Sequence, residues 1–399
     1  MTDRTREQDL LLCCSRTHAD ASTRERIDAL LGSELDWDRF LQLANVQQVM
    51  PLVASMLCGS LASRCPPAVV VRLRSDARAV TMHSLRLAHA LADVLDLFAA
   101  HRIPVIPYKG PTLSAIAYGQ LGLRQFGDLD VWVHPWDYRF RVPGMLAADG
   151  WLPAADYSWE RSFRHPHRDI VLDVHQALTH RPFTPFSLRF DAALNRGADV
   201  EVAGTHATTL AAPDLLVVLC IQLAKDAGEE RDGPPLIKVC DIAELMRRHP
   251  ELDWHAAVRI ARDEGVLHVL CLGVAVAAKL LGAGVPDQIG VLMRKVRDLD
   301  SLVRHVEERI FDDGQRQYTR PELLDRFAWN AAIRERFRDR NRTMIALLQD
   351  VFVPNEPEFA LVRLPKPLFP AYRIVRPARL AWKYFRLALG MRPGGTPRR

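Results

Sequence analysis

The chain has 399 residues, of which 48% are hydrophobic and 25% are charged, a balance typical of a soluble globular protein. It is long enough for two domains, or for one large domain with helical additions. The net charge of +5 is unevenly distributed, because residues 361–399 hold ten Lys or Arg and no Asp or Glu. The remainder of the chain is therefore acidic, with a net charge of about −5.

Membrane and secreted classes are not indicated. No uninterrupted apolar run reaches membrane-spanning length, and the polar segment Met1–Glu7 lacks the apolar core of a signal peptide. The cysteines are odd in number and form no Cys-x-x-Cys pair. We therefore expect a cytoplasmic protein with buried free thiols. The seven cysteines are Cys13, Cys14, Cys58, Cys65, Cys220, Cys240 and Cys271.

Residues 1–101 are expected to form a helical region. The stretch Glu34–Phe40 contains an Asp placed to cap a helix. The segment Ala68–His101 carries apolar residues at helical spacing, among them Leu73, Leu87, Leu91 and Phe98. Such a stripe predicts one long helix that packs against a sheet.

The stretch Val105–Val133 carries most of the functional information. It predicts a short strand, a turn at Gly110, a helical segment and a second strand. In an extended chain residues two apart share a face, so Asp128 and Asp130 point the same way. Two adjacent carboxylates repel each other unless a cation lies between them, and Mg²⁺ prefers such oxygen ligands. For an isolated Asp-x-Asp, a strand edge with two solvated aspartates is the simpler interpretation.

Two neighbouring features favour the metal-binding interpretation. Gly110 allows backbone amides to approach a phosphate without obstruction by a side chain. Downstream, the apolar strand Asp169–His175 contains Asp173, which would supply a third carboxylate from an adjacent strand.

This order of motifs resembles the nucleotidyltransferase superfamily, and within it the bacterial family labelled "uncharacterised nucleotidyltransferase". The resemblance covers roughly Arg24 to Pro286. It rests on Pro104-Val105-Ile106, Lys109-Gly110, Leu113, Tyr118, Leu123-Arg124, Gly127-Asp128-Leu129-Asp130, Val133 and Asp173-Val174-His175.

The resemblance implies an α/β (α+β) nucleotidyltransferase core with a mixed sheet, flanked by helical regions. We expect a helical N-terminal region over 1–101, the catalytic core over 102–205, a helical C-terminal domain over 206–350 and a basic, partly disordered tail over 351–399. The implied activity is Mg²⁺-dependent transfer of an NMP group from an NTP to a hydroxyl or phosphate. The acceptor would be a small molecule, a modified peptide or a nucleic-acid end. A non-catalytic nucleotide- or RNA-binding module that retains the fold is the alternative.

The resemblance also implies roles for the motif residues. Asp128, Asp130 and Asp173 would be catalytic and would bind two Mg²⁺ ions, with Mn²⁺ as a possible substitute. Lys109 and Gly110 would bind the triphosphate. The Gly-Gly/Ser pair of the superfamily is Gly110-Pro111 here, and because proline has no N–H, triphosphate binding depends more on Lys109.

Several further candidates keep two interpretations each. Arg124 pairs with a phosphate or an acidic partner, or is a surface arginine. His175 orients Asp173 or binds substrate, or is a core histidine. Lys238 and Asp241, three residues apart on a predicted helix, form a helix ion pair, or face the active cleft as the family implies.

Two other stretches have patterns that suggest a binding function. His165-Pro166-His167 has a His-x-His pattern, but a loop or hairpin is favoured over a metal site because no third ligand is placed nearby. The basic tail 361–399 interleaves aromatic residues with Lys and Arg. It would contact RNA, lipid or an acidic partner, or form a docked helix with a frayed end.

Overall fold

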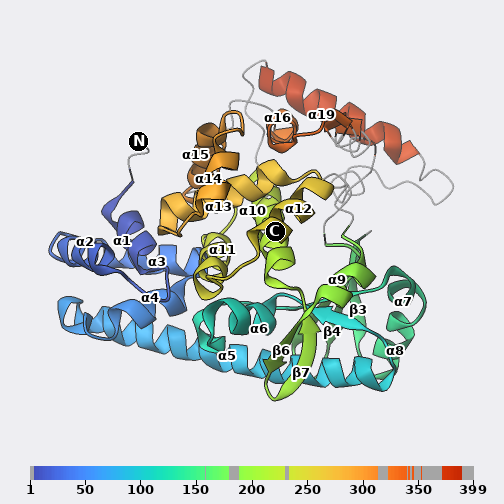
Figure 1. Cartoon of the computed structure of the whole chain (residues 1–399), viewed down its shortest axis with the longest axis horizontal. Coiled ribbons are helices and arrows are strands. Elements are labelled where there is room, and N and C mark those ends of the chain that lie inside the picture. Colours follow the sequence, from blue (N-terminus) through green and yellow to red (C-terminus); the bar gives the residue numbers. More distant parts are fainter. Residues whose placement is uncertain are drawn as a thin grey trace.

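The fold is that of a computed structural model, which describes residues 4–157, 159–178, 188–229, 233–312, 322–338, 340–341, 344–345, 352 and 371–388. Figure 1 shows it with sequence-ordered colours. The N-terminal helices are α1 (Arg6–Cys14), α2 (Ala21–Leu31), α3 (Trp37–Val46), α4 (Met50–Leu57), η1 (Ala62–Arg64) and α5 (Pro67–Ala100). The central elements are β1 (Val105–Pro107), α6 (Gly110–Leu113), η2 (Ser114–Tyr118), η3 (Leu121–Leu123), β2 (Leu129–Val133), α7 (Pro135–Phe140), α8 (Val142–Ala148), β3 (Leu152–Asp156), β4 (Glu160–His165), β5 (Ile170–His175), α9 (Phe190–Arg196), β6 (Ala198–Val202) and β7 (Thr205–Thr209). The C-terminal helices are α10 (Ala212–Glu229), α11 (Ile237–Arg248), α12 (Trp254–Asp263), α13 (Leu267–Leu281), α14 (Asp287–Met293), α15 (Leu299–Ile310), α16 (Glu322–Ile333) and α19 (Tyr372–Ala388).

Five strands form one mixed sheet in the order β1-β2-β5-β4-β3. The pair β2–β5 is parallel, and the other neighbours are antiparallel. The predicted α/β core with a mixed sheet and helical flanks is confirmed. The hairpin predicted around His165-Pro166-His167 is also present, because β4 ends at His165 and returns through a turn into β5.

The two faces of this sheet pack into separate apolar clusters. Leu129, Val131 and Val133 of β2 join Leu91 and Phe98 of α5 in one cluster. Residues on the opposite face, including Trp132, join the larger cluster built by the N- and C-terminal helices. The side chains of β2 alternate between the two clusters because successive residues of a strand point to opposite faces of the sheet. The predicted helix against the sheet is therefore confirmed, and α5 ends one residue before the predicted His101.

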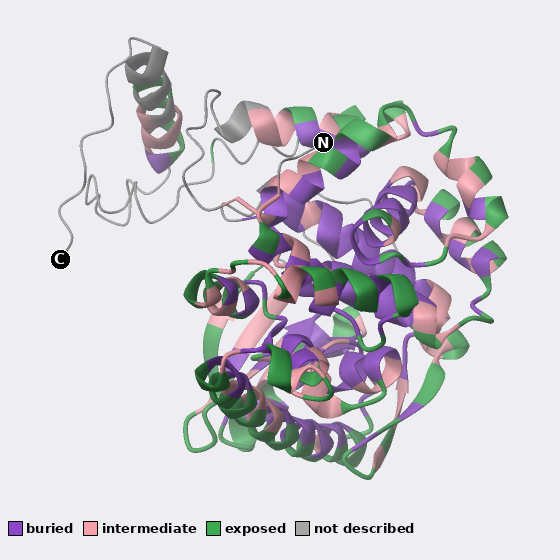
Figure 2. Ribbon diagram, turned by 90° about the vertical axis from the view of Figure 1, so that its left-hand side faces the viewer, coloured by how far each residue is buried: buried purple, intermediate pink, exposed green. Residues whose placement is uncertain are grey.

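The position of α5 is clear in Figures 1 and 2, where this helix lies along the lower side of the molecule. Its outer side is lined with exposed residues, and its inner side is buried toward the sheet (Figure 2). A helix with one apolar side of this kind is stabilised mainly by the packing of that side.

A short hairpin follows α9. The strand β6 ends at Val202, and Ala203 and Gly204 have φ of 52° and 85°. Positive φ at two successive residues forms the tight turn of a hairpin. The hairpin β6–β7 is thus a separate two-stranded sheet. It crosses residue 205, where the core was expected to end. Thr209 Oγ1 donates a hydrogen bond to the Pro107 carbonyl at 2.6 Å and ties this hairpin to β1.

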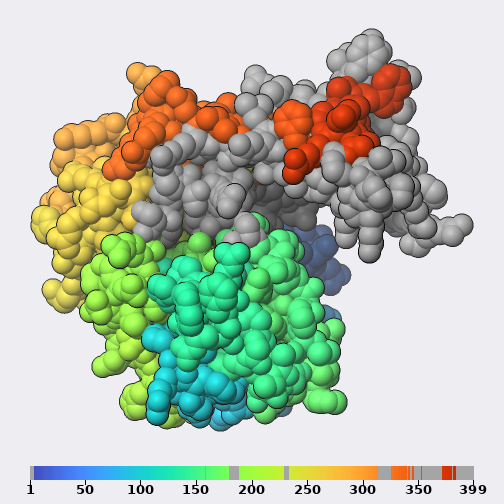
Figure 3. All heavy atoms as spheres, turned by 90° about the vertical axis from the view of Figure 1, so that its right-hand side faces the viewer, coloured from blue at the N-terminus to red at the C-terminus, as the bar shows by residue number. Residues whose placement is uncertain are grey.

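The C-terminal helices lie within the region 206–350 that was expected to be helical, and α19 lies beyond it. Asp253 caps α12, with its side chain accepting a hydrogen bond from the Ala256 N–H at 2.9 Å. Part of the basic tail forms α19, which Figure 3 shows in red on the upper part of that face. Residues 361–370 and 389–399 of the predicted tail lie outside the described residues.

The expectation of buried free thiols is confirmed. All seven cysteines are free, and six of them are buried, Cys58 being half-buried. Within the described ranges, no helix has both the length and the apolar character needed to cross a membrane.

Candidate active site

The turn between β1 and α6 places Lys109 and Gly110 next to the start of β2. Gly110 has φ of +52°, a left-handed conformation that disfavours residues with a side chain. A Cβ atom there would lie 3.1 Å from the Asp128 carbonyl oxygen. The backbone of this turn therefore approaches the Asp128 backbone closely only because residue 110 is glycine.

Asp130 is buried at the centre of the site, and it pairs in register with Asp173 on the parallel neighbour β5. Its Oδ1 accepts a hydrogen bond from Lys109 Nζ at 3.1 Å and lies 3.0 Å from His175 Nε2. Burial opposes ionisation of Asp130, but Lys109 and His175 outweigh it and lower the pKa of this carboxyl. Asp130 is thus ionised, with two donors on one oxygen.

The pKa values of the other two carboxyl groups, those of Asp128 and Asp173, are raised. The charge of Asp130 and then burial raise the pKa of Asp128 to about 6, against the opposing charge of Lys109. Burial raises the pKa of Asp173, and the charge of Asp130 adds to this effect. Asp173 Oδ1 is buried and has no hydrogen-bond partner in the described part of the structure. The sequence-predicted carboxylates are therefore brought together, and two of them are destabilised in their charged form.

Replacing Asp128 by Asn should raise the free energy of unfolding at about pH 7.5 but not at about pH 4. The folded protein keeps the Asp128 proton between about pH 4 and 6, where the unfolded chain releases it, so stability falls as pH rises through this window. Because one pKa unit corresponds to about 1.4 kcal/mol, the gain at the higher pH should be at most about 3 kcal/mol.

Urea unfolding in the presence of EDTA measures this difference. Asp199→Asn is the control, because Asp199 is an exposed residue of β6 and the same change there should leave both values unaltered. Equal stability of wild type and Asp128→Asn at about pH 7.5 would contradict the repulsion between Asp128 and Asp130.

Arg124 is buried and paired with Asp241, so the surface interpretation of this arginine is wrong. Its Nε and Nη2 donate to the two Asp241 oxygens at 2.7 and 2.9 Å. Tyr118 Oη also donates to Asp241, at 2.7 Å. A bidentate pair of this kind fixes the guanidinium in one orientation. Of the two partners considered for Arg124, the acidic one is present in this structure.

The ion pair considered between Lys238 and Asp241 does not form. Lys238 Nζ is instead paired with the buried Asp226 of α10. The α11 residues Lys238 and Asp241 therefore connect that helix to two different parts of the fold, α10 and the loop before β2.

Sequence reasoning missed four residues of this site. Glu160 Oε2 lies 3.3 Å from His175 Nδ1, and Ser162 hydrogen-bonds to Asp173. Both lie on β4, where Glu160 is in register with His175 and Ser162 with Asp173. Their spacing of two residues places them on one face, so they could have been predicted as neighbours of His175 and Asp173 if β4 had been paired with β5. Tyr118, a partner of Asp241, belongs to the motif that carries the family resemblance but was given no role, and Asp226, the partner of Lys238, carried no comparable signal.

A pocket of about 360 Å³ lies between the sheet and the helices α10 and α11. Lys109, Arg124, Asp128 and Asp130 line it from the sheet side, and Lys238 and Asp241 line it from α11. Asp173 and His175 are not among its lining residues, although Asp130 contacts His175 and pairs with Asp173. Six of the predicted site residues thus share one pocket.

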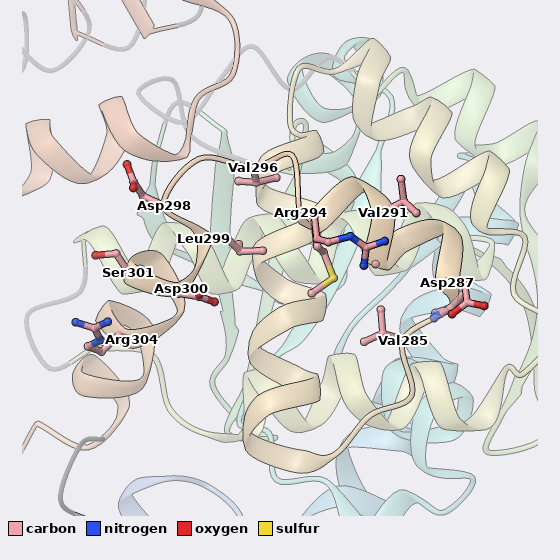
Figure 4. A pocket seen from close by; sticks show the side chains of 13 residues that line it. Val285, Asp287, Val291, Arg294, Val296, Asp298, Leu299, Asp300, Ser301 and Arg304 are labelled. Carbon is pink, nitrogen blue, oxygen red and sulfur yellow. The ribbon is translucent and has the colours of Figure 1, made fainter.

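A larger hollow of about 890 Å³ lies elsewhere, between α14 and α15. Figure 4 shows Asp300, Ser301 and Arg304 of α15 on one side of it and Asp287 and Val291 of α14 on the other. None of the predicted site residues lines it. Volume alone therefore does not identify the functional site here, and the smaller pocket has the perturbed carboxyls.

The residues present fit a divalent cation such as Mg²⁺. In the described residues no group of three or more His, Cys, Asp or Glu side chains is already arranged around a metal position. Mg²⁺ is commonly bound by one or two carboxylates, with water and phosphate oxygens completing its shell, so a preformed cage is not required. The unpartnered Oδ1 of Asp173 and the raised pKa of Asp128 are what such a site shows without its cation.

Comparison with known proteins agrees with this geometry. A search of curated proteins finds no match. The model of one family, described as "Uncharacterised nucleotidyltransferase", matches residues 33–282, which include the whole sheet and the helices α10 and α11. The chain therefore belongs to the uncharacterised nucleotidyltransferase family.

Proposed function

We propose that this protein transfers an NMP group from an NTP to a hydroxyl or phosphate acceptor and depends on Mg²⁺. The observation that carries the proposal is the carboxylate cluster, in which Asp130 and Asp173 are register partners on parallel strands and Asp128 precedes Asp130 by two residues. Clustered carboxylates cost folding stability, and two of the three, Asp128 and Asp130, line the pocket, so the cluster is best explained by a cation that it binds.

Asp128, Asp130 and Asp173 would hold the metal. When bound, Mg²⁺ stabilises negative charge on the phosphate oxygens and lowers the pKa of the attacking hydroxyl. Asp173 Oδ1 has no hydrogen-bond partner in the described structure and its carboxyl has a raised pKa, so it is suited to accept a proton from the acceptor hydroxyl. His175, held between Asp130 and Glu160, would fix the orientation of Asp130.

The triphosphate would lie along the turn at Lys109 and Gly110. The ammonium of Lys109 is the cationic group nearest Asp130 in this pocket, at 3.1 Å, and would interact with a phosphate as a point charge. Because residue 110 is glycine, no side chain obstructs a phosphate at this turn, although Pro111 has no N–H to donate. Arg124 and Asp241 would shape the pocket wall through their mutual ion pair, and Lys238 adds a second cation.

The acceptor class stays open among small molecules, modified peptides and nucleic-acid ends. Binding of RNA or an acidic partner through the basic tail, with or without catalysis, is the second candidate function. The observation that favours it is α19, whose described part contains several arginines and no acidic residue. Deletion of residues 361–399 should then weaken RNA binding, and more steeply at low salt than at high salt.

Two measurements test the proposed transfer. Calorimetry with each NTP should show binding that Mg²⁺ strengthens and that the double variant Asp128→Ala plus Asp130→Ala abolishes. Incubation with labelled NTP, Mg²⁺ and a cell extract should label an acceptor. Nucleotide binding that ignores Mg²⁺ and survives the double substitution would contradict the transferase and favour a binding module.

A further inference from the structure

Three glutamine side chains from separate segments line the pocket that contains Asp128 and Asp130. Gln48 lies between α3 and α4, Gln125 precedes β2, and Gln222 lies on α10. They meet in one cavity although α10 is far from the other two in sequence. An amide group carries both donors and an acceptor, so this wall can pair with a ligand that presents both kinds of group.

One of these amides is almost fully buried, and another has a buried oxygen without a hydrogen-bond partner within the described residues. Gln222 is only 8% exposed. Gln125 Oε1 is buried and has no partner in the same residues. A buried amide without a partner costs about 1–3 kcal/mol, so such a group facing a pocket indicates a ligand that completes its hydrogen bonds.

Gln48 adds a backbone observation. Its φ is +58°, the left-handed conformation that ends α3, where the Val49 N–H donates to the Ala44 carbonyl at 3.0 Å. The neighbouring Gln47 fixes this position, because its side-chain Oε1 accepts from the Leu236 N–H at 2.6 Å and its Nε2 donates to the Ile310 carbonyl at 2.7 Å. The segment is therefore anchored to α11 and α15 in a conformation that places residue 48 on the pocket.

We propose that this amide wall recognises the nucleobase of the NTP and selects adenine, with Gln222 as the main specificity residue. Adenine presents an amino donor beside a ring-nitrogen acceptor, which one glutamine amide can pair with in a bidentate manner. Cytosine presents the same pair of groups on a single ring, which would bury less apolar surface than the two rings of adenine. Guanine presents two acceptors on the corresponding edge, so one of its contacts would be lost. Leu219, Ile237 and Phe126 supply apolar surface in the same pocket for the faces of the ring.

The inference rests on the proposed function, because it assigns the base of the same NTP. Its test is titration calorimetry with non-hydrolysable analogues of ATP, GTP, CTP and UTP, and with inorganic tripolyphosphate as a ligand without a base. The proteins are the full-length wild type, Gln222→Leu, the near-isosteric Gln222→Met, and Gln42→Leu as control. Gln42 is exposed on α3, outside the pocket, and undergoes the same chemical change.

The wild type should bind the ATP analogue about tenfold or more tightly than the GTP analogue. Both Gln222 variants should bring this ratio close to one while tripolyphosphate affinity stays within about twofold, and Gln42→Leu should keep the wild-type ratio. A merely structural role of Gln222 would weaken every ligand together and leave the ratio unchanged, which would overturn the inference. Equal affinity of the wild type for all four analogues would overturn it as well and leave the proposed transferase intact. Failure of every analogue and of tripolyphosphate to bind would refute the transferase itself, and the base assignment with it.

Discussion

Asp173→Asn should reduce nucleotidyl transfer by about three orders of magnitude or more and should leave the folded protein as stable as the wild type, or more stable. A metal ligand supports several kcal/mol of charge stabilisation, and each 1.4 kcal/mol corresponds to a tenfold change in rate. Stability should not fall, because burial already opposes the charge of Asp173 and its Oδ1 has no partner to lose within the described residues. The Asn oxygen can still accept the hydrogen bond from Ser162.

Pyrophosphate release from NTP measures activity, and urea unfolding measures stability. Asp169→Asn is a matched control just before the same strand, because Asp169 is exposed, paired with Arg164, and has φ of +48°, which Asn tolerates. This control should retain activity. Full activity of Asp173→Asn would remove Asp173 from the catalytic cluster, and loss of stability without loss of activity would assign it a structural role.

The strand that carries Asp130 was predictable because its pattern is local. Alternation over Asp128–Val133 determines which residues share a face, and β2 with its buried Leu129, Val131 and Val133 agrees. The long apolar stripe of α5 is equally local and was predicted to within a residue or two at each end. Gly110 was identified from its place between a strand and a helix, and its positive φ gives the physical reason.

The partners across the fold were not predictable, because they depend on strand register and helix packing. The apolar strand around Asp173 indicated a third carboxylate from an adjacent strand, but its register with Asp130 depends on strand pairing that spacing does not give. Arg124 and Asp241 lie 117 residues apart, so nothing in the sequence near Arg124 identifies its partner. In the same way, the i,i+3 spacing of Lys238 and Asp241 suggested an ion pair that the packing of α10 beside α11 replaces.

Asp241→Ala should destabilise the protein by about 3–5 kcal/mol, which is a large fraction of the stability of a typical domain. The change removes the acceptor of a bidentate pair and leaves the Arg124 guanidinium, itself 8% exposed, without its anion. It also removes the acceptor of the buried Tyr118 hydroxyl. By contrast, Asp28→Ala breaks the exposed pair with Arg64 and should cost less than about 1 kcal/mol.

A double-mutant cycle with Arg124→Met separates the ion pair from other effects of Asp241. Because replacing both charges leaves no unpaired buried ion, Arg124→Met plus Asp241→Ala should be more stable than the sum of the single changes predicts, by about 2 kcal/mol or more. Urea unfolding of the four proteins gives the coupling energy. Additive effects would mean that Arg124 is stabilised by other groups when Asp241 is absent. If the double variant folds but binds NTP weakly, the pair contributes to the pocket through Arg124 or Asp241 directly, because stability no longer limits binding.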